Sequence, residues 1–133
     1  MVLPLKEWQE QRKLFDHARA QVKLNPISKW RMLFGSMNGL RSTPAAVQMA
    51  KLCGMAVGFP DTGILVMGHA GCPGAFCELK RKHKGWESCG WDCASDDQIK
   101  WRNWLKGEGY EVEVAHGADE AINFYTNYLE INE

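Results

Sequence analysis

Apolar residues recur at helical spacing near both ends of the chain. Over residues 6–22 they define one face, which we expect to carry Trp8, Gln11, Phe15, Ala18 and Val22. Over about residues 118–130 the same spacing predicts a last helix whose buried face carries Ala118, Ala121, Ile122, Tyr125 and Leu129. Both helices are therefore expected to pack one face against a core.

Two more helices are marked by their capping residues. Thr43 followed by Pro44 predicts a helix that begins there and runs to about Cys53. The run Ser95-Asp96-Asp97-Gln98 matches a capping box and predicts a helix that continues to about Lys106. Residues 28–34 fit either a short helix or a strand.

Three segments have the patterns of β-strands. Residues 64–67 are continuously apolar, which is typical of a short strand covered on both faces. Residues 75–81 form a second candidate strand, and residues 109–115 alternate apolar and acidic positions, as in a half-buried strand. The order α, α, β, β, α, β, α predicts one domain over residues 1–133, an α/β fold with a small sheet flanked by helices.

Charge is divided unevenly along the chain, although the formal net charge is zero. All 16 Lys and Arg lie between Lys6 and Lys106 with only 9 acids (16 − 9 = +7), and 7 acids but no Lys or Arg follow from Gly107 onward. A basic body with an acidic end can hold a polyanion such as DNA on one surface, although solvated faces would give the same counts. No signal peptide or membrane-spanning run is evident, so we expect a cytoplasmic protein.

Two carboxylates and a lysine are predicted to converge. Asp61 precedes one candidate strand, Glu78 lies within the next, and Lys80 leaves the same strand face as Glu78. Hard oxygen ligands suit Mg²⁺ or Mn²⁺, which activates water and neutralises charge during phosphodiester hydrolysis. Lys80 could then orient the water or stabilise the oxyanion. The alternative is a salt bridge of Glu78 with Lys80 or Arg81.

Two helices could contribute further site residues. Glu7, directed partly inward, is a candidate extra metal ligand, although a first-turn acid is also favoured by the helix dipole alone. The pattern leaves open whether Glu7 or Glu10 completes the site. Gln98 either serves the capping box or faces the sheet and reaches the site.

Basic and aromatic residues near the second strand are candidate DNA contacts. The cluster of residues 80–84 could grip phosphates through Arg81, Lys82 and Lys84, and Arg41, Lys100, Arg102 and Lys106 could extend that surface. Trp86 and Trp91 could stack on bases or pack locally. For Trp101 and Trp104 the simplest expectation is a core position on their helix.

The five cysteines are expected to be reduced thiols rather than a disulfide framework. Their spacings also fall within the range of zinc ligands, and a zinc site would need Cys72, Cys89 and Cys93 with His69 or His83. The sequence favours ordinary buried or exposed thiols over that site.

The motifs also resemble a known family. Residues 58–61 (Gly-Phe-Pro-Asp), 76–80 (Phe-Cys-Glu-Leu-Lys) and 95–98 (Ser-Asp-Asp-Gln) look like the motifs of the VRR-NUC family, virus-type replication and repair nucleases within the PD-(D/E)xK superfamily. Residues 6–15 resemble its opening helix and residues 109–114 its closing strand. Residues 37–42, with Asn38 and Arg41, resemble a stretch that precedes the PD motif in phage-type members.

The resemblance implies a restriction-endonuclease-like core and a role for each site residue. Asp61 and Glu78 would ligate Mg²⁺ or Mn²⁺ with the Leu79 carbonyl, and Lys80 would be catalytic. Glu7 would be the helix-borne acid and Gln98 a supporting residue. Stand-alone members resemble Holliday-junction resolvases and act as homodimers, so the family implies an endonuclease on branched DNA in a bacterial or phage-infected host cytoplasm. The alternatives are a DNA-binding module without turnover and a nuclease of linear DNA.

One departure from the family pattern concerns the stretch between Lys80 and Gln98. It is longer than the family pattern leads us to expect, and it carries Trp86, Cys89, Trp91 and Cys93. An insertion at this place would lie beside the site, where it could alter substrate choice or contribute to a dimer surface.

Overall fold

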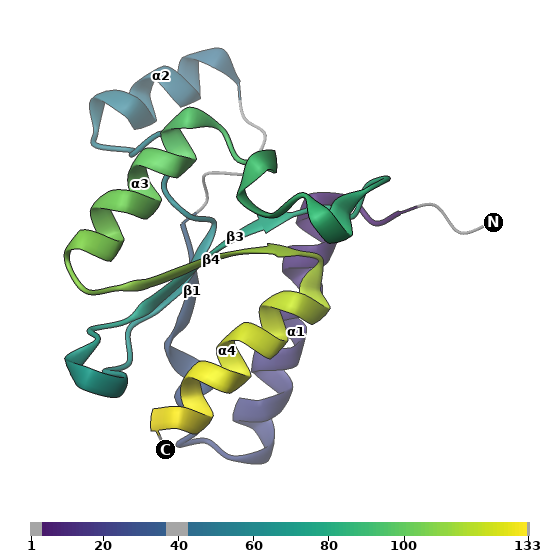
Figure 1. Cartoon of the computed structure of the whole chain (residues 1–133), viewed down its shortest axis with the longest axis vertical. Coiled ribbons are helices and arrows are strands. Elements are labelled where there is room, and N and C mark those ends of the chain that lie inside the picture. Colours follow the sequence, from purple (N-terminus) through teal and green to yellow (C-terminus); the bar gives the residue numbers. More distant parts are fainter. Residues whose placement is uncertain (1–3, 37–42, 133) are drawn as a thin grey trace.

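A four-stranded mixed sheet organises the computed structural model, which describes residues 4–36 and 43–132 (Figure 1). The strands lie in the order β1 (Leu33–Gly35), β2 (Thr62–Ile64), β3 (Ala75–Lys80) and β4 (Glu111–His116). The first two pairings are antiparallel and β3 pairs with β4 in parallel. The α/β class expected from the sequence is confirmed.

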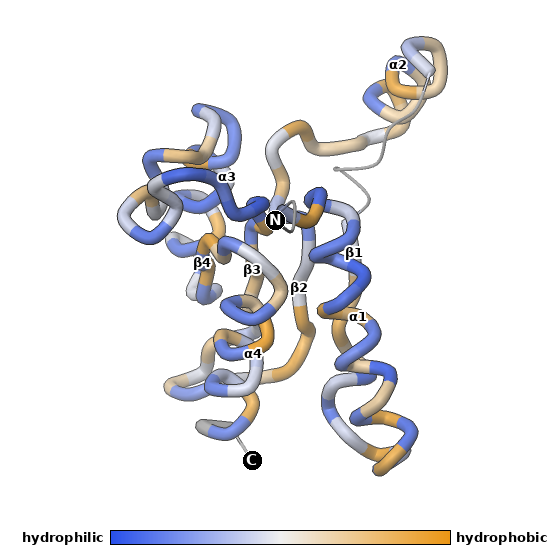
Figure 2. The backbone as a smooth tube through the Cα atoms, turned by 90° about the vertical axis from the view of Figure 1, so that its right-hand side faces the viewer, coloured by the Kyte–Doolittle hydropathy of each residue, from blue (hydrophilic) through white to orange (hydrophobic). Residues whose placement is uncertain are grey.

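The described residues also form four α-helices, α1 (Glu7–Leu24), α2 (Pro44–Leu52), α3 (Asp96–Gly107) and α4 (Ala118–Asn132). Helices α1 and α4 lie together against the sheet, and α3, which connects the parallel strands β3 and β4, lies on the other side (Figure 1). Helix α2 buries no residue and stands apart from the sheet (Figure 2).

Alternation along β3 assigns its two faces. Ala75, Cys77 and Leu79 are fully buried in the larger core cluster, together with residues of α1 and α4. Phe76 belongs to a smaller cluster with Leu105 of α3. Because side chains alternate along a strand, Glu78 and Lys80 leave β3 on the same face as Phe76, toward α3. The fold therefore places both predicted site residues on one side of the sheet.

A buried polar chain ties the larger core to the central strands. The Thr62 and Tyr125 hydroxyls lie 2.7 Å apart, and the Thr62 hydroxyl donates to the Cys77 carbonyl at 3.1 Å. Each of these polar atoms has a partner, as burial demands. This arrangement fixes β2, β3 and α4 relative to one another directly beside Asp61.

The capping predictions hold. The Thr43 side chain accepts a hydrogen bond from the Ala46 N–H at the start of α2. At the start of α3, Ser95 and Gln98 form the reciprocal capping box. Local sequence chemistry therefore located both helix starts.

One strand prediction needs correction, and one open alternative is resolved. The strand expected over residues 64–67 is β2, which ends at Ile64, and Leu65 and Met67 are 53% and 75% exposed. Strand β2 ends at Ile64 because both neighbouring strands begin opposite this residue. Ile64 pairs with Leu33 at the beginning of β1 and with Ala75 at the beginning of β3. The ambiguous segment 28–34 contains both alternatives, a 3₁₀ turn over Lys29–Met32 followed by β1.

Two predictions about buried helix residues were wrong in part, although Ala18 of the predicted α1 face is buried and Phe15 and Val22 pack against the larger core as expected. In α1 the buried residues are Glu10, Leu14 and Ala18, whereas Trp8 is 54% exposed. The buried face is thus rotated from the predicted one, since α4 and the sheet contact α1 along the Leu14 side. Trp104, expected in the core, is 58% exposed. Over the described residues, no helix is both long and apolar enough to cross a membrane.

Candidate metal and catalytic site

Strand pairing places Asp61 beside Glu78. In the β2–β3 register Thr62 pairs with Cys77, so one step further along both chains brings Asp61 level with Glu78. The two residues are only 6% and 2% exposed. Glu7, at the first turn of α1, supplies a third carboxylate, and one oxygen from each of the three lies within 4.8 Å of the others. Three acids that are distant in sequence thus share one small volume.

Hydrogen bonds orient the two buried carboxylates but leave one oxygen unpaired. Asp61 Oδ2 accepts from the Leu79 N–H at 2.9 Å. Glu78 Oε1 accepts from Gln98 Nε2 at 2.8 Å. Glu78 Oε2 is buried and has no hydrogen-bond partner among the described residues. An unpaired buried carboxylate oxygen is costly unless it holds a proton or a cation.

Without a cation, the electrostatics of the site favour a proton on the buried carboxylates. Burial, followed by the neighbouring Asp61 carboxylate, raises the pKa of Glu78 to about 10. Burial also raises the pKa of Asp61 and, together with Asp61, that of Glu7. Lys80 opposes these shifts without cancelling them. Glu78 and Asp61 therefore retain a proton in a hydrogen bond between their side chains, and a bound cation would replace that proton.

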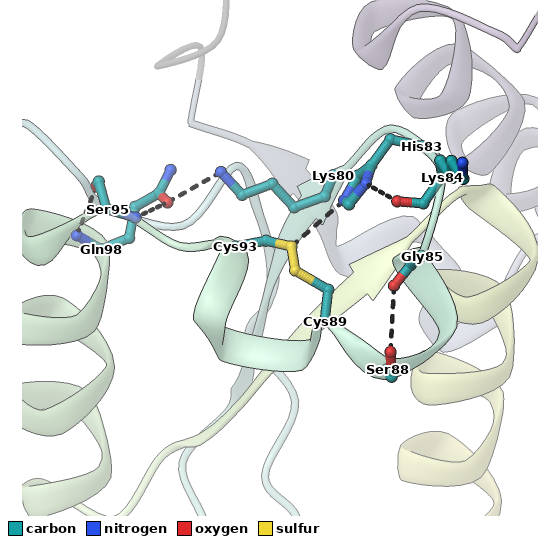
Figure 3. Close-up of a disulfide and its surroundings, with 9 residues drawn as sticks. All are labelled: Lys80, His83, Lys84, Gly85, Ser88, Cys89, Cys93, Ser95 and Gln98. Carbon is teal, nitrogen blue, oxygen red and sulfur yellow. Dashed lines mark hydrogen bonds between the residues drawn. A yellow bond between two sulfur atoms is a disulfide. The ribbon is translucent and has the colours of Figure 1, made fainter.

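Gln98 connects the capping box to the site. Its Oε1 accepts from the Ser95 N–H at 2.8 Å and from Lys80 Nζ at 3.0 Å (Figure 3). Its Nε2 donates to Glu78. The two interpretations of Gln98 left open by the sequence are thus both present in the structure. One amide fixes the start of α3, the Lys80 ammonium and the Glu78 carboxylate at once.

The donor set fits a hard divalent cation. Asp61, Glu78 and Glu7 offer carboxylate oxygens, the ligand type preferred by Mg²⁺ and Mn²⁺. The orphaned Glu78 Oε2 is the observation that supports this fit, because a cation would satisfy it. The Leu79 N–H donates to Asp61, whereas the role of the Leu79 carbonyl as a metal ligand stays a prediction.

Glu7 and Glu10 differ in their surroundings. Glu10 is 4% exposed and lies against Gly117, where an added Cβ would come within 2.5 Å of Glu10 Oε2. Glu10 is not part of the carboxylate group around Asp61, whereas Glu7 is. The geometry therefore favours Glu7 as the third acid.

The described residues among the predicted DNA contacts lie on the segment after β3 and on α3. Arg81 and Lys84 are exposed after β3, and Lys100 is exposed on α3. Two other predicted contacts lie over aromatic rings. Lys82 Nζ is 5.1 Å from the centroid of the Trp86 ring, and the Arg102 guanidinium carbon is 4.9 Å from that of Trp91. Asn38 and Arg41 lie outside the described residues.

The segment between Lys80 and Gln98 contributes to a group of cysteine and histidine side chains whose members differ from those predicted from the sequence. Cys89 and Cys93 are in contact and are drawn as a disulfide in Figure 3, which differs from the expectation of reduced thiols. One ring nitrogen of His83 and one of His116 lie within 4.8 Å of both sulfur atoms. Cys72 is elsewhere, with its thiol 3.1 Å from the Gly74 carbonyl. The residue that the sequence-based set lacked is His116, which the β3–β4 register pairs with Lys80.

Comparisons with known proteins identify the fold. No family model matches the chain, and no curated protein matches it in sequence. A solved structure described as a "VRR_NUC domain protein" superimposes with a TM-score of 0.74 and 22% sequence identity, over 98% of this chain and 93% of that chain. The chain therefore has the fold of a VRR_NUC domain protein, in agreement with the family that its motifs resemble.

Proposed function

We propose that this chain is a divalent-metal-dependent DNA endonuclease whose site consists of Asp61, Glu78 and Lys80, with Glu7 and Gln98 in support. One observation carries the proposal: among the described residues Glu78 Oε2 is buried without a partner, in a side chain that shares a site with the Asp61 and Glu7 carboxylates and a strand face with Lys80. The fold shared with a VRR_NUC domain protein supports the same activity.

A cation held by Asp61, Glu78 and Glu7 would supply positive charge against the scissile phosphate and lower the pKa of a bound water. The protein's own groups do the rest. Gln98 holds Lys80 Nζ at 3.0 Å, so the ammonium is fixed before substrate arrives. A fixed cation stabilises the charge that develops on the phosphate better than a mobile one does, because it needs no reorganisation.

A buried carboxylate pair without a cation would repel phosphate only if ionised. Burial keeps a proton on this pair, as the raised pKa of Glu78 indicates. If Asp61, Glu78 and Glu7 hold a cation, they would give up that proton on binding it, so metal affinity and cleavage should both rise with pH. Lys80, two residues from Glu78, remains available as the cation that contacts the phosphate.

Arg81 and Lys84 are exposed just after β3 and Lys100 is exposed on α3, and all three provide positive charge for the DNA backbone. We extend the proposal to branched DNA cut by a homodimer, as the motif resemblance implies, because two-fold symmetry would place two sites on two strands. The alternatives are a nuclease of linear DNA and a binding module without turnover.

The test compares cleavage of a labelled immobile four-way junction and a matched linear duplex, with Mg²⁺ or Mn²⁺. Paired nicks on the junction are expected from the wild type, and Lys80→Ala should slow cleavage by about 100-fold or more. Lys84→Ala, which removes a nearby exposed lysine, is the matched control and should weaken binding only slightly.

Each alternative has its own result in this experiment. Cleavage of both substrates at the same rate would favour the linear-DNA nuclease. Junction binding without any cleavage under either metal would favour the binding module and would overturn the proposed activity.

A further inference from the structure

A second group of ligating side chains lies beside the nuclease site and takes no part in it. His83, Cys89, Cys93 and His116 each place one ligand atom within 4.8 Å of the others. His83 Nε2 is 3.3 Å from Cys93 Sγ, and the Cα atoms of Cys89 and Cys93 are 5.8 Å apart. In a tetrahedral zinc site, with metal–ligand distances near 2.0 to 2.3 Å, ligand atoms are about 3.3 to 3.8 Å apart.

The hydrogen bond on the far side of the His83 ring fixes its tautomer. His83 Nδ1 is 3.0 Å from the Lys84 carbonyl, which can only accept, so Nδ1 carries the proton (Figure 3). In the neutral ring, Nε2 then presents a lone pair toward Cys93. A metal-bound histidine typically donates its other ring N–H to a backbone carbonyl in this way.

His116 provides an independent indication of a ligand. It is 2% exposed, and its Nε2 is buried with no hydrogen-bond partner among the residues that the structure describes. A disulfide between Cys89 and Cys93 would leave this nitrogen unpaired. It would also offer His83 Nε2 a sulfur with no proton to donate. Oxidised sulfurs therefore account for two of the four groups and leave both histidines unexplained.

The surrounding segment lacks a core of its own. None of residues 81–94 is buried, and their only regular structure is two 3₁₀ turns, Trp86–Ser88 and Gly90–Cys93. Small segments without enough apolar contacts are commonly held by a metal or a disulfide. Two sulfurs and two imidazoles arranged around one point favour zinc over harder cations.

We infer that His83, Cys89, Cys93 and His116 form a structural zinc site in which both cysteines are present as thiolates. This zinc site would anchor residues 81–94 to the end of β4. His116 pairs with Lys80 in the sheet, and Ser95 follows Cys93 by two residues. The zinc site would therefore hold the chain at both ends of the segment that joins Lys80 to Gln98.

The first test is the metal content of the full chain, purified with a thiol reductant and zinc but without a chelator. About one zinc per chain is expected in the wild type and less than about a tenth in Cys93→Ser. Cys53→Ser, which removes an exposed free thiol, should keep its zinc. Wild-type protein with no zinc would overturn the inference, whatever the variants do.

A second measurement on the wild type guards against a Cys93→Ser variant that fails to fold. Cobalt(II) added to the zinc-free, reduced chain should give the visible absorption of a tetrahedral thiolate complex. Glu78→Gln should give the same spectrum, because its carboxylate belongs to the other site. No such spectrum would contradict the zinc site. A count of only three titratable thiols among the five cysteines, in chain isolated without a reductant and then unfolded with a chelator, would also contradict it, because a Cys89–Cys93 disulfide would have stayed closed.

The two proposals fail separately. Loss of zinc binding with intact cleavage would remove the structural site and leave the nuclease. Zinc binding in a chain that cleaves no DNA would do the reverse.

Discussion

Glu78 occupies the most constrained position in the proposed nuclease site. One of its oxygens is bound by Gln98, the other is unpaired, and the side chain is almost fully buried. An ionised carboxylate in this position destabilises the fold unless a cation is bound. Function and stability should therefore oppose each other at this residue.

The opposition predicts a pH dependence. The pKa of Glu78 rises from its ordinary 4.5 to about 10 in the folded chain, so the folded state binds more protons than the unfolded state between these values. The free energy of unfolding without Mg²⁺ or Mn²⁺ should then fall as pH rises through this window, by at most about 1.4 kcal/mol per pH unit. Chemical denaturation between about pH 6 and pH 9 measures it.

Glu78→Gln is the variant that isolates this effect, because the amide cannot ionise. It should lose most of the slope and be more stable than the wild type at the upper end of the range. Equal slopes for the two proteins would show that Glu78 does not carry the proton.

Gln98 has two functions that matched variants can separate. Ser95→Ala removes the hydroxyl that accepts the Gln98 N–H but leaves the Gln98 side chain, and it should cost about 1 kcal/mol of stability with little effect on cleavage. Gln98→Ala should cost a similar amount and also slow cleavage by about 10-fold or more, since Glu78 and Lys80 both lose a partner. Denaturation and single-turnover cleavage measure the two effects. Similar cleavage rates for the two variants would limit Gln98 to capping.

At the scale of elements, the loop before Asp61 depends on its close approach to α3. Gly58 has a φ of +85°, and an added Cβ would lie 2.7 Å from the Asp97 carbonyl carbon. Gly58→Ala should therefore destabilise the chain by about 2 to 3 kcal/mol and displace the loop. Gly71→Ala, with a φ of +79° and no atom within 4 Å of the added Cβ, should cost about 1 kcal/mol. Equal losses in thermal or chemical denaturation would show that the contact with Asp97 contributes nothing.

The elements differ in how far the sequence could predict them. Helix starts at Thr43 and Ser95 depend on local side-chain chemistry, and they were predicted to the residue. The end of β2 depends on where Leu33 of β1 and Ala75 of β3 pair with Ile64, which is tertiary information. An apolar run alone therefore extended that strand too far.

The site residues show the same division. Asp61, Glu78 and Lys80 could be grouped from strand periodicity and the order of the motifs. The group around Cys93 could not, because His116 reaches it only through the parallel pairing of β3 with β4. The choice of Glu7 over Glu10 likewise depends on how α1 is rotated against the sheet.

At the scale of the whole molecule, sheet and helices serve different purposes. The central strands fix the two acids and Lys80 to a rigid sheet, while α1 and α3 bring Glu7 and Gln98 from either side. Basic residues lie between Lys6 and Lys106, and the acidic end follows, so positive charge is confined to the part of the chain that holds the site. This distribution suits a polyanionic substrate.

Mn²⁺-dependent cleavage of a four-way junction by Asp61→Asn, by Glu10→Gln and by the wild type tests whether Asp61 belongs to a metal-dependent nuclease site. The first removes an acid of the site; the second removes a buried acid outside it and serves as the matched control. We predict a loss of at least about 100-fold for Asp61→Asn at every Mn²⁺ concentration and near wild-type rates for Glu10→Gln. Wild-type cleavage by Asp61→Asn, or an equal loss in both folded variants, would show that Asp61 is not part of a metal-dependent nuclease site.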